Sequence, residues 1–457
     1  MKPDYKILPS VSEVIVNIDN YKSFNSKYLT SLIRSEIKSF RKKIESGKIN
    51  YTRIELTEKI AENVIRTLNG NIIPLINGTG IVLHTGFGRA PISKKVLSRV
   101  VDKLSSYINL EFQLEDGKRG DRNSLVDTFL AAVSCSESAL VVNNNAAAVM
   151  LTINTLADQK EVVVSRGQLV EIGGSFRIPD IISKSSGILK EVGSTNRTHL
   201  KDYEKAISKN TGMILWVHTS NYKVEGFTKD VSLEDLVSLG KKYKIPVVAD
   251  LGSGILVEPT FNIGTELTVE SVVKTGASLV TYSGDKLLGG PQSGIIAGKA
   301  KFIKELKKNS IYRALRCDKF TLALLEETLM TYNSEGINKS NMSHLLLNRT
   351  QKELYKTADK INQVLNPKTI KKLGLKIVPS LVEAGSGAMP VQSLESVAFT
   401  FTPKDITASK LATNFRAHRP SIVGYIKGNK FYLDLKALIP GQEKILISGI
   451  EKVAESL

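Results

Sequence analysis

Apolar residues in the first 75 positions recur at helical spacing. Between positions 29 and 44 most of them lie three or four residues apart, as in Leu29, Leu32, Ile33, Ile37, Phe40 and Ile44. Such a stripe forms one face of an amphipathic helix. A second stripe covers residues 60–68 and ends before Asn69-Gly70-Asn71, a sequence typical of helix termini. We therefore expect residues 1–75 to form a separate helical domain.

From about residue 76 the pattern changes to short apolar runs separated by helix-length segments. The runs are ALVV (139–142), EVVVS (161–165), MILWVH (213–218), IPVVAD (245–250) and SLVTYS (278–283). Runs that are apolar throughout indicate strands buried on both faces, and the intervening helices indicate βαβ units. This pattern predicts an α/β domain over residues 76–318 with a mainly parallel central sheet.

The last part of the chain predicts a smaller α+β domain over residues 319–457. Helical segments are expected at 319–332 and 349–364, followed by the strand SVAFTF at 396–401. The segment SIVGYIKGNKFYLDL at 421–435 carries Gly428-Asn429 between two strand-like runs, which predicts a hairpin.

The composition is that of an ordinary globular protein, with 42% hydrophobic and 24% charged residues among 457. No apolar run is long enough for a membrane span, and the N-terminus does not resemble a secretion signal. The two cysteines, Cys135 and Cys317, lie far apart, which argues against a disulfide framework and fits a reducing cytoplasm. The histidines show no metal-ligand spacing, so no metal is expected.

The net charge of +18 is distributed unevenly. Basic and acidic residues number 13 and 8 in residues 1–75 (+5), 25 and 23 in residues 76–300 (+2), and 25 and 14 in residues 301–457 (+11). Basic ends around a nearly neutral middle suit a polyanion such as nucleic acid. A lysine-rich proteome, in which surfaces become basic without any partner, explains the charge equally well.

The stretch SGDKLLGGPQSG at 283–294 places Lys286 beside an aspartate in a turn of small residues. Small residues allow something bulky to come close, so the lysine is a candidate reacting group and the glycines are expected to make room for a ring. An exposed lysine in an ordinary loop is the alternative.

Two further features fall at the carboxyl ends of predicted strands, where parallel α/β sheets bind ligands. ALVVNNNAAAV (139–149) runs from a strand into an asparagine-capped helix start, whose free N–H groups suit a phosphate. Asp250 ends the strand IPVVAD and suits a protonated ring nitrogen. Either feature alone is also explained by ordinary helix or turn capping.

The order of these features predicts a pyridoxal phosphate enzyme of the aspartate aminotransferase type. Lys286 follows a later strand, 36 residues beyond Asp250, and would form a Schiff base with the cofactor aldehyde. Asp250 would keep the pyridine nitrogen protonated, so that the ring accepts electrons. The predicted cofactor-binding residues are Lys286, Asp250, Asn144, Asn145, Ala146 and Ser283.

Three arginines are candidates for binding an oxyanion. Arg89 closes the glycine-rich stretch NGTGIVLHTGFGR (77–89), and Arg313 and Arg316 lie three residues apart in IYRALRCDK. A guanidinium group binds phosphate-like anions with two parallel hydrogen bonds. Surface ion pairing is the alternative for the 313/316 pair.

Longer motifs resemble one family in order and spacing from about residue 75 to 440. They include NGTGIVLHTGFGRAPIS, VVNNNAAAVML, SRGQLVEIGGSFRIPDI, EVGSTNRTHLKDYEKAI, HTSNYKVEGF, DLGSG, SGDKLLGGPQSGIIAGK, YRALRCDKFTLALLE and RPSIVGYI. These motifs resemble the bacterial selenocysteine synthases, the L-seryl-tRNA(Sec) selenium transferases, which are fold-type I pyridoxal phosphate enzymes. The helical N-terminal segment also has the length expected of the full-length bacterial enzymes.

The resemblance implies a reaction and a set of partners. Seryl-tRNA(Sec) would become selenocysteinyl-tRNA(Sec) through a pyridoxal phosphate aldimine and a dehydroalanyl-tRNA intermediate, with selenophosphate as the selenium donor. Lys286 would be the Schiff-base lysine, Asp285 would assist catalysis, and Arg89, Arg313 and Arg316 would hold selenophosphate. The N-terminal domain would bind the tRNA, with Arg34, Lys38, Arg41, Lys42 and Lys43 as candidate phosphate contacts. The resemblance further implies a cytoplasmic homodecamer, a pentamer of dimers with active sites at the dimer interfaces.

The chain departs from the family pattern at four positions. The family reads SRGELVEIGG, EVGTTNRTH, INATG and LGG-PQAG, where this sequence has Gln168, Ser194, Gly78 and Ser293. Because this chain has Gln168 where the family has glutamate, it lacks a charge near the expected pocket.

Two other functions stay open. The first is a related pyridoxal phosphate lyase acting on a small amino acid or amino-sugar acid, for which a helical N-terminus has no evident use. The second is a catalytically silent tRNA-binding protein on the same scaffold, which would not need the lysine, the aspartates and the arginines together.

Overall fold

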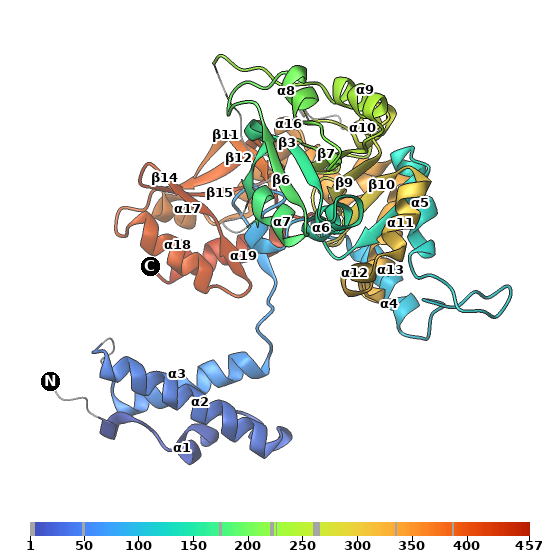
Figure 1. The fold of residues 1–457 in the computed structure, drawn as a ribbon. Helices are drawn as coiled ribbons and strands as arrows, with labels where there is room; N and C mark the ends of the chain where they lie inside the picture. The colour runs from blue at the N-terminus through green and yellow to red at the C-terminus, as the bar shows by residue number, and fades with distance from the viewer. Residues whose placement is uncertain are drawn as a thin grey trace. The chain divides into compact units, whose positions relative to one another are not determined.

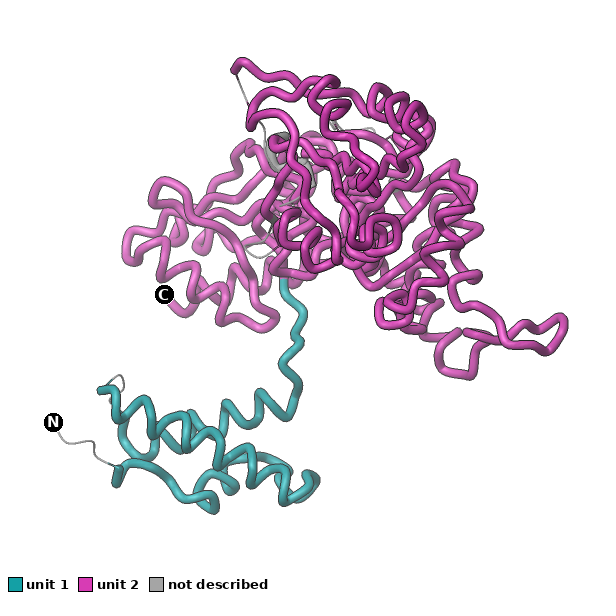
Figure 2. Tube along the Cα trace, viewed as in Figure 1, with its two compact units in different colours: residues 1–75 teal, residues 76–457 magenta. Residues whose placement is uncertain are grey.

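The computed structural model describes residues 5–47, 51–172, 176–219, 224, 226–258, 266–333, 336–385 and 388–457. The chain divides into two compact units, residues 1–75 and residues 76–457 (Figures 1 and 2). No helix in the described part of the chain is both long and apolar enough to cross a membrane.

The N-terminal unit is a small helical bundle. Its helices are α1 (Val11–Val16), α2 (Ser26–Glu45) and α3 (Arg53–Leu68), with short 3-10 turns η1 (Tyr5–Ile7) and η2 (Tyr21–Ser23). The apolar stripe predicted on the long helix is confirmed, because Leu29, Ile33 and Phe40 of α2 are buried against α3 and α1. The predicted end of the second helix is also confirmed, since α3 ends with Asn69 as its C-cap.

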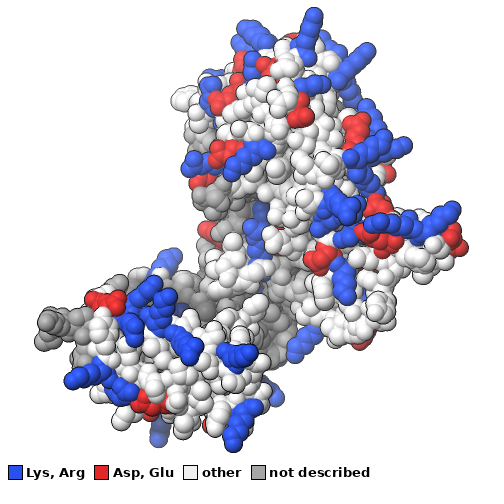
Figure 3. All heavy atoms as spheres, turned by 60° about the horizontal axis from the view of Figure 1, so that its bottom comes forward, with Lys and Arg blue, Asp and Glu red and all other residues white. Residues whose placement is uncertain are grey.

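Basic side chains are frequent on one face of this unit. On the face drawn in Figure 3, Lys and Arg predominate over acidic residues on the N-terminal unit. A groove of about 530 Å³ lies between the start of α1 and the exposed side of α2, and its lining residues are Pro9, Ser10, Val11, Arg34, Ile37, Lys38, Arg41, Lys42 and Glu45. We call this surface the basic groove.

The second unit is built on a seven-stranded sheet. In spatial order its strands are β2 (Ser138–Val142), β10 (Gly294–Gly298), β9 (Leu279–Ser283), β8 (Val247–Gly252), β7 (Thr211–Val217), β3 (Glu161–Ser165) and β6 (Ile188–Val192). The pairs from β9 to β6 are parallel, whereas β10 runs antiparallel to both of its neighbours. The predicted α/β class and mainly parallel sheet are therefore confirmed.

Helices cover both faces of this sheet, which explains why its strands are apolar throughout. Successive strand residues enter opposite cores, so that Val163 lies in one and Val162 and Val164 in the other. The helices around this sheet are α4 (Lys94–Leu104), α5 (Ser124–Ser134), α6 (Asn145–Leu156), α7 (Ile178–Lys184), α8 (Leu200–Ala206), α9 (Leu233–Tyr243), α10 (Val269–Lys274), α11 (Ala300–Lys308), α12 (Ser310–Leu315) and α13 (Lys319–Met330).

A second sheet with four antiparallel strands lies in the C-terminal part of the same unit. It comprises β11 (Lys376–Gly385), β12 (Ala388–Phe401), β15 (Lys430–Asp434) and β14 (Tyr425–Lys427), and α16 (Gln351–Val364), α17 (Pro367–Leu373), α18 (Ala408–Ala417) and α19 (Glu443–Glu455) contribute to its core. The predicted hairpin is confirmed, because Lys427 pairs with Lys430 across Gly428 and Asn429, both at positive φ.

A short link ties this sheet to the segment that carries Arg89. Strand β1 (Leu75–Asn77) pairs with β13 (Ser421–Val423), and the Asp434 N–H donates to the carbonyl of Gly78 at 2.8 Å. A Cβ at Gly78 would lie 2.7 Å from Leu433 Cδ2. Glycine at this departure from the family pattern therefore permits close contact with β15.

Candidate active site

Lys286 lies in a tight turn directly after β9. Its residue exposure is 6%, which excludes the alternative of an exposed loop lysine. Three backbone hydrogen bonds close the turn, from Gly284 N–H to Ser293 O, from Gly290 N–H to Gly284 O and from Gly289 N–H to Lys286 O.

The glycines of this turn pack against the protein itself. A Cβ at Gly284 would overlap Ser293 Oγ, and one at Gly289, where φ is +76°, would overlap the side chain of Asn341. The expectation that these glycines make room for a ring is therefore wrong for these two positions. They allow the turn to fold onto its own neighbours and so fix the backbone that carries Lys286.

Burial is the main influence on the Lys286 amine. It lowers the pKa of Lys286 below the usual value, and the nearby Arg89 lowers the pKa further. The carboxylates of Asp250, Asp285 and Glu266 oppose this shift. A buried amine with a lowered pKa is more often uncharged, and only the uncharged amine is a nucleophile or a base.

Asp250 lies within β8 and is buried. Its Oδ1 accepts hydrogen bonds from Asn145 Nδ2 and Thr281 Oγ1, each at 2.8 Å, and the Gly252 N–H also bonds to the carboxylate. Burial raises the pKa of Asp250 by more than its hydrogen bonds and the nearby Lys286 lower it, so a further positive charge beside the carboxylate would stabilise its ionised form. A protonated pyridine nitrogen would be such a charge, so the residue fits the predicted cofactor.

The start of α6 fits the cofactor phosphate. The Asn144 side chain caps the helix by accepting from the Ala147 N–H at 2.9 Å, while Asn145 and Ala146 belong to the same first turn. Gly294 of β10 touches this turn so closely that a Cβ would overlap the Asn144 carbonyl. Ser283 pairs with Gly294 across the sheet and is therefore held beside the same turn.

Arg89 reaches the lysine turn from a different segment. Its Nη1 donates to Asp285 Oδ2 at 2.9 Å, and the Ala90 N–H donates to the Asp285 carbonyl at 3.3 Å. Arg89 adopts a φ of +61° and follows Gly88, the C-cap of the turn η3 (Thr85–Phe87). We call Arg89, Asp250, Asp285 and Lys286 the lysine cluster, and the structure brings all of its members together.

Arg313 and Arg316 lie in a separate pocket of about 330 Å³, which we call the arginine pocket. Its lining residues are Glu111, Arg119, Gly120, Asp121, Arg122, Lys307, Tyr312, Arg313 and Arg316. Among the described residues, no hydrogen bond or ion pair joins Arg313 or Arg316 to Asp250 or Asp285. A backbone hydrogen bond links the start of α6 to the end of α12, since the Asn143 N–H donates to the Leu315 carbonyl at 3.0 Å.

A carboxylate occupies the arginine pocket from within the chain. Glu111 accepts from Arg122 Nη2 at 2.5 Å and from Arg119 Nη2 at 2.8 Å, and it lies 3.6 Å from Arg316 Nη1. The hydrogen bonds from Arg122 and Arg119 lower the pKa of Glu111 to about 2. Arg316 therefore does form an ion pair within the chain, as the alternative interpretation expected. The pocket nevertheless gathers several guanidinium groups around Glu111.

Residues far along the chain support the lysine turn from behind. The Leu288 carbonyl accepts from Tyr332 Oη at 2.7 Å and from Asn341 Nδ2 at 3.1 Å, and His344 Nε2 lies 3.0 Å from the Leu287 carbonyl. These side chains come from η5 (Thr331–Asn333), the turn after α14 (Ile337–Ser340), and α15 (Met342–Leu347).

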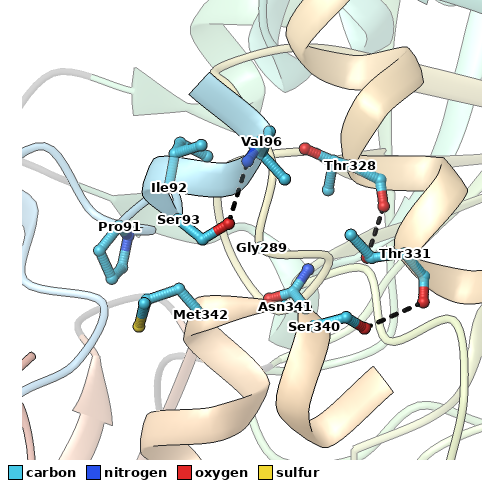
Figure 4. A pocket seen from close by; sticks show the side chains of 10 residues that line it. All are labelled: Pro91, Ile92, Ser93, Val96, Gly289, Thr328, Thr331, Ser340, Asn341 and Met342. Atoms are coloured by element: carbon cyan, nitrogen blue, oxygen red, sulfur yellow. Dashed lines mark hydrogen bonds between the residues drawn. The ribbon is translucent and has the colours of Figure 1, made fainter. Parts of the chain in front are cut away.

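Figure 4 shows this region, with the Asn341 side chain beside Gly289 of the turn. A cavity of about 10 Å³ lies here, lined by Ser93, Thr328, Thr331, Ser340 and Asn341 among others, and it is just large enough for one water. Sequence reasoning missed Tyr332, Asn341 and His344, because nothing in the local sequence links them to position 286.

A further buried carboxylate, Glu266, lies at the same edge of the sheet. Its Oε2 accepts from Ser253 Oγ at 2.7 Å and lies 3.6 Å from His218 Nε2. The side chains of Glu266 and His218 are 5% and 12% exposed. Sequence reasoning did not single out either residue as a site residue.

The departures from the family pattern leave this geometry intact. Gln168, in the turn η4 (Arg166–Gln168), is buried, and its Oε1 accepts from the Val217 N–H at 3.1 Å. A glutamate would offer the same acceptor oxygen, so the exchange removes charge while it keeps the hydrogen bond. Ser194 is exposed, whereas Ser293 is buried and donates to the Pro291 carbonyl.

Comparisons with known proteins agree on one family. The family model described as L-seryl-tRNA selenium transferase matches residues 75–439. The L-seryl-tRNA(Sec) selenium transferase of Alkaliphilus oremlandii is 39% identical over 463 aligned residues, and that of Caldanaerobacter subterraneus is 41% identical over 461, with 99% of both chains covered in each case.

Among solved structures, D-glucosaminate-6-phosphate ammonia-lyase aligns with a TM-score of 0.60 at 19% identity, covering 86% of this chain and 98% of the other. At this identity the likeness shows the fold alone.

Proposed function

The chain belongs to the family of L-seryl-tRNA selenium transferases, and we propose that it converts L-seryl-tRNA(Sec) to L-selenocysteinyl-tRNA(Sec) with selenophosphate. The observation that carries this proposal is the match to enzymes of that name over 99% of both chains. The buried Lys286, next to a buried aspartate and a capped helix start, supplies the chemistry that such a conversion needs.

The chain is a transferase with the fold of type I pyridoxal phosphate enzymes, and its cofactor is pyridoxal 5′-phosphate. When bound, the cofactor joins an amine covalently and withdraws electrons from the adjacent carbon. We assign Lys286 to the cofactor aldehyde and Asp250 to the ring nitrogen. The first turn of α6, with Asn144, Asn145 and Ala146, receives the phosphate, and Ser283 lies beside it.

The remaining roles follow from contacts within the chain. The uncharged Lys286 amine takes the α-proton of the seryl group, which its lowered pKa favours. Arg89, Arg313 and Arg316 bind the selenophosphate oxyanion, and Asp285 assists by holding Arg89. The backbone hydrogen bond between Asn143 and Leu315 supports the assignment of Arg313, because it joins the residue just before the α6 cap to the helix that carries Arg313.

The basic groove of the N-terminal unit is our candidate tRNA-binding surface. Arg34, Lys38, Arg41 and Lys42 line it, while Lys43 instead lies over the ring of Phe40. A cavity edged by several cations and few carboxylates suits a phosphate backbone. Replacing Arg34 and Lys38 together by glutamine should weaken binding of tRNA(Sec) and reduce its salt dependence by about one charge per residue replaced. An unchanged salt slope would move the tRNA contact to another surface.

We propose that the protein is a homo-oligomer, with the decamer as the expected form. The supporting observation is a face on α4, α13 and the segment between α4 and α5, where Val101, Tyr107, Leu114 and Phe320 are exposed. A cavity of about 460 Å³, lined by residues of these elements, lies on this face. Light scattering of the purified protein measures the mass directly, and a monomer would refute the assignment.

A cytoplasmic location is part of the same proposal. An aminoacylated tRNA is a cytoplasmic substrate, and both cysteines are free, Cys135 exposed and Cys317 buried.

The decisive experiment is conversion of seryl-tRNA(Sec) by the purified protein supplied with pyridoxal phosphate and selenophosphate. Selenocysteinyl-tRNA(Sec) is the expected product, and it should be absent with Lys286→Ala. Cofactor-loaded protein that forms no such product, yet eliminates ammonia or water from a small amino acid, would instead establish the related lyase.

A further inference from the structure

The backbone and the side chain of Asn145 serve different parts of the cofactor site. Asn145 is the first residue of α6, so its backbone N–H belongs to the turn assigned to the phosphate. Its side chain points elsewhere, because Asn145 Nδ2 donates to Asp250 Oδ1 at 2.8 Å. One residue therefore takes part at both ends of the site, the phosphate turn and the carboxylate assigned to the ring nitrogen.

The orientation of the Asn145 amide depends on the charge of Asp250. An ionised carboxylate can only accept hydrogen bonds, so it requires the NH₂ group of Asn145 to face it. The amide oxygen, Asn145 Oδ1, is buried and has no hydrogen-bond partner in the described part of the chain. A buried acceptor without a partner costs stability. A neutral Asp250 carboxyl would donate to that oxygen in the opposite orientation, so the observed orientation is the one that favours the ionised form.

Thr281 binds the same oxygen of Asp250. It pairs with Asp250 between β9 and β8, is fully buried, and its Oγ1 donates to Asp250 Oδ1 at 2.8 Å. Neither side-chain donor uses Oδ2, so a ring N–H that binds Oδ2 competes with neither of them. Burial raises the pKa of Asp250, and the hydrogen bond from Asn145 is the largest of the effects that lower this pKa.

We propose that Asn145 is a positioning residue that holds Asp250 in its ionised form and thereby keeps the ring nitrogen of bound pyridoxal phosphate protonated. Thr281 contributes to the same role through its hydroxyl. The proton stays on the ring nitrogen, because a carboxylate that accepts two hydrogen bonds is a weaker base than one that accepts none. This inference rests on the cofactor assignment within the proposed function and involves neither tRNA nor selenophosphate.

A cofactor analogue that lacks the ring nitrogen isolates this interaction. In 1-deazapyridoxal 5′-phosphate a C–H group replaces the nitrogen, while the aldehyde and the phosphate are unchanged. The ratio of the two dissociation constants, measured with cofactor-free protein, therefore reports the contact with Asp250 and cancels the contact with the phosphate turn. Wild type should prefer pyridoxal phosphate. Asn145→Leu keeps a similar side-chain volume but removes the donor, and it should lower this preference by about tenfold, as expected for one hydrogen bond to a charged group.

Protonation of the ring nitrogen is a second readout, which a purely structural role of Asn145 would not change. With nitrogen-15 in the ring, the chemical shift in wild type should be that of a protonated pyridine. In Asn145→Leu it should move towards that of the unprotonated ring. Asn154→Leu is the matched control, because Asn154 lies on the same helix and its Nδ2 donates to the Ser185 carbonyl at 3.2 Å. This control should keep both the preference and the chemical shift.

Thr281 keeps the test decisive if Asn145→Leu does not fold. Thr281→Val removes the other side-chain donor to Asp250 and should change both readouts in the same direction, whereas Thr281→Ser keeps the hydroxyl and should behave as wild type. Unchanged readouts in the folded donor-less variant would overturn the proposal, and so would a wild-type protein that binds both compounds equally well. A protein that passes these tests but forms no selenocysteinyl-tRNA(Sec) would refute the proposed function alone.

Discussion

The lysine cluster and the arginine pocket both combine carboxylates with cations, but they differ in their access to water. Lys286 and Asp250 are each 6% exposed, whereas the Arg119 and Arg316 side chains in the arginine pocket are 76% and 28% exposed. Burial is the first cause of the pKa shifts of Lys286 and Asp250, while hydrogen bonds from arginines are the first cause at Glu111.

This difference separates two kinds of chemistry. Exclusion of water makes charged groups unfavourable in the lysine cluster. Proton exchange and the binding of a charged ring both lower the free energy of these groups. In the arginine pocket, water and several guanidinium groups keep charge stable, which suits binding of a small anion. We therefore expect substitutions of Lys286 and Asp250 to affect the rate of reaction and substitutions in the arginine pocket to affect the affinity for selenophosphate.

Removal of the Lys286 amine should have the largest effect. Lys286→Ala should lower formation of selenocysteinyl-tRNA(Sec) by at least about 10³-fold, because both the covalent link and the base for the α-proton are lost. The absorbance band of the protein-bound cofactor and the adduct trapped by borohydride should disappear together. Lys299→Ala, which changes the residue just after β10, is the control and should keep both signals. A trapped adduct that maps to another lysine would show that the lysine cluster is not the site of the covalent chemistry.

Replacement of the Asp250 carboxylate should follow in magnitude. Asp250→Asn keeps acceptors for Asn145 and Thr281 but removes the charge that stabilises a protonated ring, so we expect the conversion rate to fall by about 10²-fold. The Michaelis constant for selenophosphate should change little. Thr281→Val removes one hydrogen bond to the same carboxylate and should cost far less. An Asp250→Asn enzyme with normal turnover would show that burial of this carboxylate serves stability alone.

The sequence was sufficient for those parts of the fold and site that follow from local pattern. Runs of apolar residues identified β2, β3, β7, β8 and β9, because burial on both faces requires them. It missed β6, an edge strand that includes Lys190 and Glu191, and β10, whose three apolar residues lie between glycines.

The site shows the same limit. Lys286, Asp250 and Asn144 follow predicted strands, so their order along the chain suggested a shared cofactor. Glu266 and His344 follow no recognisable motif, and only the tertiary fold brings them close to the lysine turn. The arginine pocket also depends on topology, since Glu111 and Arg316 are about 200 positions apart.

Truncation of Arg316 should act on affinity. Arg316→Ala should raise the Michaelis constant for selenophosphate by about tenfold, equivalent to about 1.4 kcal/mol, and leave loss of the seryl hydroxyl nearly unchanged. Lys118→Ala is the control, because Lys118 lies outside the pocket lining and its side chain is 77% exposed. An effect of Arg316→Ala on the turnover number alone would place this guanidinium with the lysine cluster.

Removal of the Glu111 carboxylate should have the smallest effect and the opposite sign. Glu111→Gln frees guanidinium groups that now bind this carboxylate, so the affinity for selenophosphate should rise, by about threefold if the gain resembles that of an exposed ion pair. The variant should also be slightly less stable than wild type at neutral pH, because it lacks the pairs with Arg122 and Arg119.

The pH dependence of that stability difference distinguishes pairing from a packing effect. The pKa of Glu111 falls from 4.5 to about 2 on folding, so the folded protein holds the proton less tightly than the unfolded chain. The stabilisation is therefore complete above pH 4.5 and is lost as the pH falls towards 2. Thermal unfolding of wild type and Glu111→Gln should converge over this range. A constant difference would mean that Glu111 acts through its shape, and the contrast between a charge-binding pocket and a proton-exchanging cluster would then fail at this residue.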